Sequence, residues 1–90
     1  MDAKHQPVPW HDRAVVIAHA TAEAPLRREL FEGTLGAAVL WMKKRHLSAR
    51  GHSIFLPDRA LPPRSVMKED LARLLHLNHH VIEAECKVRS

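Results

Sequence analysis

The hydrophobic pattern separates a first stretch without periodicity from a patterned remainder. Pro7 and Pro9 lie among polar neighbours, so we expect residues 1–9 to form an extended N-terminal segment. Residues 13–20 are mostly apolar and include three consecutive β-branched side chains, which favours a short buried strand. Because 90 residues are too few for two separate cores, we predict that residues 10–90 form a single domain.

A helical pattern runs from Thr21 to about Leu47. Thr21 can cap a helix whose first turn tolerates the carboxylate and the proline that follow it. Steps of 100° per residue place most of the apolar side chains on one broad face, so the main prediction is one long central helix. The alternative breaks the helix at Gly33 or Gly36 and makes residues 37–42 a buried strand.

The second half of the chain contains three more predicted elements. Residues 52–56 read as a short strand, and the Pro-rich residues 57–64 form a connector that cannot be helical. Ser65 is placed to cap a second, shorter helix that ends near Leu77. Residues 80–89 alternate strictly between apolar and polar side chains, which predicts a C-terminal strand.

Together these elements predict an α+β domain. Its order is β-α-β-α-β, with the long and the short helix packed on a small sheet. The alternative with a strand at residues 37–42 has the order βαββαβ of the ferredoxin-like arrangement. The C-terminal strand is expected to pair with residues 53–56 or, if it lies at an edge, with its own copy in a homodimer.

The net charge of +4 is concentrated in the middle of the chain. Residues 1–35 carry four basic and five acidic side chains, residues 36–64 carry six and one, and residues 65–90 carry four of each. This local excess can neutralise phosphates, although basic residues at a helix C-terminus also offset the helix dipole. The middle segment is therefore the predicted binding surface.

We expect a small regulatory or accessory binding module that presents this surface to nucleic acid. The alternative is a protein-interaction module or inhibitor that docks on an acidic partner surface. The nearby Trp41 and Phe55 are candidates for stacking on a base, but both fit equally well in a core. The predicted binding residues are Lys43, Lys44, Arg45, His46, Arg50, His52, Arg59 and Arg64.

Residues 67–82 resemble part of a helix-turn-helix. Ala72 and Ile82 occupy fitting places, whereas His76 stands where the turn usually has glycine. Glu85 falls where the second helix usually needs a core side chain. Because the C-terminal alternation predicts a strand, this motif is the weaker interpretation of the segment.

Histidine is abundant, with eight in the chain. His76, His79 and His80 are spaced so that a continuous helix would bring them to one face, where imidazoles can bind zinc, nickel or copper. A helix that ends near Leu77 would separate them. We therefore predict no metal site and no cofactor, and keep these three histidines as the candidate ligands.

No sequence motif indicates catalysis. The chain has no P-loop, dinucleotide-binding, nucleophile-elbow or zinc-protease motif, and it contains only three glycines. Cys86 lies in an apolar row and is expected to be a buried, inert thiol. A lone cysteine, no signal sequence and no long apolar run favour the cytoplasm and no membrane partner.

Overall fold

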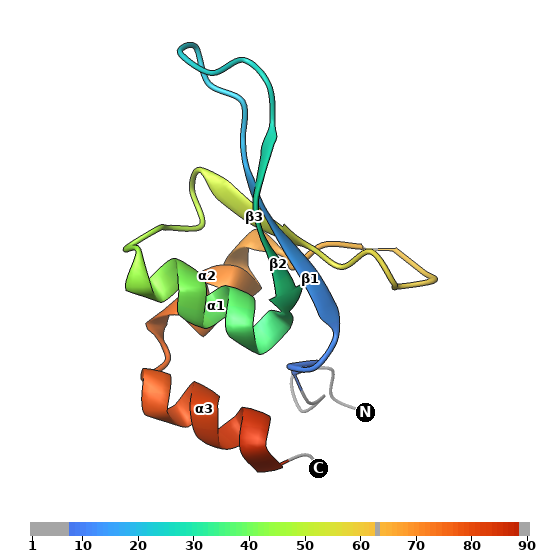
Figure 1. Ribbon diagram of the computed structural model, residues 1–90, viewed down its shortest axis with the longest axis vertical. Helices are drawn as coiled ribbons and strands as arrows, with labels where there is room; N and C mark the ends of the chain where they lie inside the picture. The colour runs from blue at the N-terminus through green and yellow to red at the C-terminus, as the bar shows by residue number, and fades with distance from the viewer. Residues whose placement is uncertain (1–7, 63, 89–90) are drawn as a thin grey trace.

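The fold is taken from a computed structural model that describes residues 8–62 and 64–88 (Figure 1). These residues form an α+β fold, which confirms the predicted class. Residues 1–7, which make up most of the predicted extended segment, and Arg89 lie outside the described residues. The elements are β1 (Arg13–Ala18), β2 (Arg28–Thr34), α1 (Leu35–Lys44), β3 (His52–Phe55), α2 (Lys68–His76) and α3 (His79–Val88).

The strands form an antiparallel sheet in the order β2-β1-β3. Val16 of β1 lies opposite Phe31 of β2 on one side and Ile54 of β3 on the other. The register of the β1–β2 pair shifts between Val16 and Ile17, and the hairpin extends above the rest of the molecule in Figure 1. The predicted strands at residues 13–20 and 52–56 are confirmed as β1 and β3.

The predicted long helix is wrong in its first half. Thr21 caps no helix: its hydroxyl accepts a hydrogen bond from the Ala24 amide at 2.9 Å within the hairpin loop. Residues 28–34 form β2 because they pair along their length with the β-branched run of β1, and this pairing outweighs the favourable helix propensity of side chains such as Arg28, Glu29 and Leu30. The alternative strand at residues 37–42 is also wrong, since those residues are helical.

Helix α1 begins where its first free amides find acceptors. The Thr34 hydroxyl accepts from the Ala37 amide at 3.1 Å. The amides of Leu35 and Gly36 donate to the carbonyl oxygens of Asp12 and Trp10 at 2.8 and 2.9 Å. Three of the donors that every helix N-terminus leaves open are thus satisfied, which fixes the start of α1 directly after β2.

The connector after β3 returns along the sheet edge. The amide of Leu56 donates to the Arg64 carbonyl oxygen at 2.6 Å, and that of Val66 donates to the Ile54 carbonyl oxygen at 2.9 Å. Ser65 forms a β-bridge with Phe55, so it does not cap α2 as predicted. Helix α2 begins at Lys68 instead, and its predicted end near Leu77 is confirmed.

The predicted C-terminal strand is wrong, because His79–Val88 forms helix α3. Ile82 is fully buried and Cys86 is half-buried, and these two residues lie four apart on one helical face. Ala84, which a strand would place on the same apolar side, is exposed. The edge beside residues 53–56 is in any case occupied by the returning connector.

The core lies between one face of the sheet and the helices. Helix α1 packs against β1, β2, α2 and α3, while α2 also packs against β3. The core cluster combines Val16 and Ile54 of the sheet with Val39, Leu71 and Ile82 of the helices. Among the described residues, no helix is long and apolar enough to span a bilayer.

Gly36 allows α3 to lie close to α1. A β-carbon at this position would overlap the Sγ atom of Cys86, whereas its contacts with Trp10 would stay ordinary. We therefore expect Gly36→Ala to be less favourable when Cys86 is present than after Cys86→Ala has removed the sulfur and left the gain in helix propensity unopposed. Urea unfolding of the four variants of this cycle should give a coupling of about 1 kcal/mol.

Gly51→Ala is the matched control, because a β-carbon at Gly51 meets no atom within 4 Å. This substitution should change the free energy of unfolding by less than about 0.5 kcal/mol. Equal effects of Gly36→Ala with and without the Cys86 sulfur would contradict the close packing of α3 on α1.

Candidate functional site

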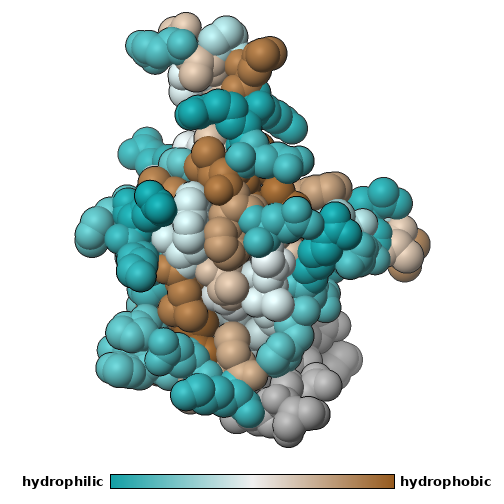
Figure 2. All heavy atoms as spheres, viewed as in Figure 1, coloured by the Kyte–Doolittle hydropathy of each residue, from teal (hydrophilic) through white to brown (hydrophobic). Residues whose placement is uncertain are grey.

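An open hollow lies between the end of α1, the loop that follows it and α2. Its volume is about 720 Å³, and it is open to solvent rather than enclosed. Figure 2 shows hydrophilic side chains along the left of the view, over the end of α1, the following loop and the start of α3. The ionisable side chains that line the hollow are Lys43, His46, Arg50, Lys68, His76 and a single acid, Glu69.

His46 lies at the end of α1 in a left-handed conformation, with φ of 59°. The amide of Leu47 donates to the Met42 carbonyl oxygen at 3.0 Å and that of His46 to the Lys43 carbonyl oxygen at 3.1 Å. This is the Schellman pattern, in which glycine usually occupies the left-handed position. A histidine there costs conformational energy, and it carries an imidazole into the hollow.

Lys43 has a structural role at the same place. Its Nζ donates to the Leu75 carbonyl oxygen at 2.8 Å. That oxygen belongs to the last turn of α2, where carbonyl groups lack helical partners. The side chain therefore ties α1 to α2 and forms one wall of the hollow.

The other predicted binding residues near α1 are oriented differently. Lys44 lines a second hollow together with His46, His79 and Glu83. Arg45 lies over the Trp41 ring, 4.8 Å from its centroid. His52 Nδ1 lies 3.1 Å from the Ser48 carbonyl oxygen, which steadies the loop that carries Arg50.

Arg59 and Arg64 lie in the connector, at the far end of β3 from Arg50 (Figure 1). Four residues of strand separate the two groups, which corresponds to about 13 Å. One nitrogen of the Arg64 guanidinium donates to the Ala60 carbonyl oxygen at 3.3 Å. The predicted surface is therefore divided between two regions, and the hollow contains only part of it.

Two lining residues, Lys68 and His76, were absent from the predicted binding surface. Lys68 reaches the hollow because the connector runs back along β3, with Val66 beside Ile54, and α2 begins where β3 began. His76 lies at the other end of α2. The composition of residues 65–90 gives no signal for them, since their charges sum to zero.

The candidate stacking residues have neighbours in the fold. The Trp41 ring stacks on Phe31 with a centroid distance of 5.2 Å, in addition to its contact with Arg45. Phe55 is one-third exposed but lies on the sheet, beyond the residues that line the hollow. The hollow therefore offers charge rather than an aromatic platform.

The helix-turn-helix resemblance is limited to the presence of two consecutive helices. Helices α2 and α3 are joined through two residues, Leu77 and Asn78, whereas the turn of the motif has about three or four. Each helix also packs against α1, whereas the two helices of the motif pack on one another. Glu83 and Glu85 are exposed on α3, where negative charge opposes a phosphate backbone.

Cys86 does not form a site with the histidines. Its sulfur faces Gly36, and six residues of helix, about 9 Å of rise, separate it from His80. Burial, with smaller effects from Glu85 and Glu83, raises the pKa of this thiol above its usual value. The thiolate is therefore disfavoured, although Cys86 is half-buried rather than fully buried as predicted.

Comparison with protein-family models, with curated proteins and with solved structures found no match to this chain.

Substitution of His46 tests the strain at the end of α1. His46→Gly should raise the free energy of unfolding by about 1 kcal/mol, because glycine adopts the left-handed conformation at little cost. His46→Ala keeps a β-carbon at this position and should not give that gain. Urea denaturation followed by circular dichroism distinguishes the two variants, and an equal change in both would contradict the strain.

The reactivity of Cys86 tests its environment. Because the folded protein holds the thiol pKa above its ordinary value, the pH at which an aromatic disulfide reagent reacts at half-maximal rate should be higher than for the same chain in urea. The absorbance of the released thiolate measures the rate. A midpoint at or below that of the unfolded chain would contradict the assignment.

Proposed function

We propose that this protein is a nucleic-acid-binding module that holds backbone phosphates in the hollow between α1 and α2. The observation that carries the proposal is the convergence of basic side chains from three segments. Lys43 and His46 come from the end of α1, Arg50 comes from the loop and Lys68 from α2, and only Glu69 opposes them. Such a cluster attracts phosphate without reading base edges.

The shape of the hollow suits a ligand that approaches from the surface, because the hollow is open to solvent. Its lining combines basic side chains with the apolar Leu47, Ala72 and Leu75, so phosphate is the group that it attracts most strongly. We therefore propose binding that is independent of sequence and sensitive to salt. Duplexes of different sequence should bind with similar affinity at the same ionic strength.

The salt dependence of binding tests the location of the site. Each phosphate neutralised on B-DNA contributes about −0.9 to the slope of log K against log salt. Arg50→Ala together with Lys68→Ala should therefore reduce the magnitude of that slope by about two. Fluorescence anisotropy with a labelled mixed-sequence duplex, measured from low to moderate salt, gives the slope.

Arg59→Ala together with Arg64→Ala is the matched control, because it removes the same charge from the far end of β3. This pair should leave the slope unchanged, and Glu69→Gln should strengthen binding. Equal slopes for the two double variants would show that net charge, not the hollow, determines binding. Absence of binding by the wild-type protein at low salt would overturn the function and favour an acidic protein partner.

A further inference from the structure

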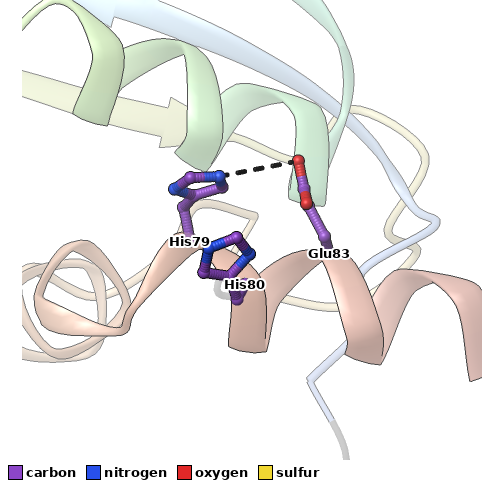
Figure 3. A group of neighbouring side chains, drawn as sticks. All are labelled: His79, His80 and Glu83. Atoms are coloured by element: carbon purple, nitrogen blue, oxygen red, sulfur yellow. Dashed lines mark ion pairs between the residues drawn. The ribbon is translucent and has the colours of Figure 1, made fainter.

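A second group of side chains converges at the start of α3, outside the hollow. One potential ligand atom from each of His79, His80 and Glu83 lies within 4.8 Å of the others. Figure 3 shows the His79 ring beside the Glu83 carboxylate, with 3.9 Å between Nε2 and Oε2. The rings of His79 and His80 are stacked, with centroids 4.5 Å apart.

The backbone under these side chains is well anchored. The Asn78 side-chain oxygen accepts from the His80 amide at 2.8 Å, and its carbonyl oxygen accepts from the amides of Val81 and Ile82. Ile82, which lies between His80 and Glu83 in the chain, is fully buried in the core. The cluster therefore extends from a capped and packed helical turn, which limits the rearrangement that a ligand would require.

We propose that His79, His80 and Glu83 bind a divalent transition-metal ion of the zinc class. Two imidazoles and a carboxylate are a ligand set that zinc accepts, with other positions left to water. Bonds of about 2.0–2.1 Å in tetrahedral geometry place ligand atoms about 3.4 Å apart. The His79 and Glu83 ligand atoms are 3.9 Å apart, and the separations that involve His80 are no more than 4.8 Å. All three side chains are exposed, so they can rotate to shorten these distances when they bind an ion.

Nearby positive charge lowers the affinity of this site for a metal ion but does not abolish binding. Lys43 and Lys44 line the hollow that also contains His79 and Glu83, and the N-terminus of α3 carries a partial positive charge. Lys43 already donates its Nζ to the Leu75 carbonyl oxygen. The site therefore binds metal more weakly than a closed site with four protein ligands.

His76 provides a control that distinguishes this site from the general affinity of surface histidines for metal ions. It was one of the three candidate ligands, but it belongs to the end of α2 and lines the other hollow. It is absent from the converging group. Its substitution therefore provides a control with the same chemistry.

Zinc titration of the full chain, freed of metal with EDTA, tests the proposal by isothermal calorimetry. The wild-type protein should bind one zinc ion at this site and no Mg²⁺, which prefers oxygen ligands. His79→Ala and Glu83→Gln should each weaken zinc binding at least about tenfold. His76→Ala and Glu85→Gln should leave the affinity unchanged.

Two results would overturn the site. One is zinc affinity that is unchanged in both His79→Ala and Glu83→Gln. The other is an equal loss in His76→Ala, which would indicate diffuse binding to surface histidines. All substituted residues are exposed, so circular dichroism should show the same helix content in every variant and ensure that lost binding is not lost folding.

Discussion

The first turn of α1 is the point on which the arrangement of the other elements depends. Its free amides are satisfied by carbonyl oxygens of Trp10 and Asp12 and by the Thr34 hydroxyl. Because these acceptors come from the segments before β1 and at the end of β2, they hold α1 at a fixed place beside the hairpin. Two strands and both other helices then pack against α1, and the end of the same helix forms the proposed phosphate site.

Elements marked by residue type could be predicted from the sequence, and those assigned from hydrophobic period alone could not. The strand β1, marked by its β-branched run, and the end of α2 near Leu77 were predicted correctly. Residues 28–34 were assigned to a helix because Leu30 and Phe31 also fit a helical face. Their pairing with β1 is a contact between distant segments, which local propensity does not describe.

The C-terminal helix shows the same ambiguity in the opposite direction. Ile82 and Cys86 lie four residues apart, a spacing that satisfies both a strand of period two and a helix. The structure resolves it through Asn78, which caps the helix, and through Gly36, which leaves room for Cys86. Each of these features is a single residue, and its effect on the fold depends on contacts that become visible only in the three-dimensional structure.

The sequence predicted some of the residues that line the candidate site, but it missed others and included some that lie elsewhere. Lys43, His46 and Arg50 belong to the charged segment that the sequence marks, and they line the hollow. Lys68 joins them because the connector doubles back along β3, and Arg59 and Arg64 are separated from them by the length of that strand. Charge counted along a chain identifies a segment, whereas a binding surface is defined by which segments the fold brings together.

The two proposed sites adjoin one another, since Lys43 and His46 line both hollows. A metal ion held by His79, His80 and Glu83 would add two positive charges beside the surface that is proposed to hold phosphate. Bound metal and bound phosphate would then attract each other, and thermodynamic linkage requires that each strengthen the other's binding by the same factor. Without the metal, the negative charge of Glu83 repels phosphate. With the metal bound, Glu83 would instead favour phosphate binding, because it would hold the positively charged ion.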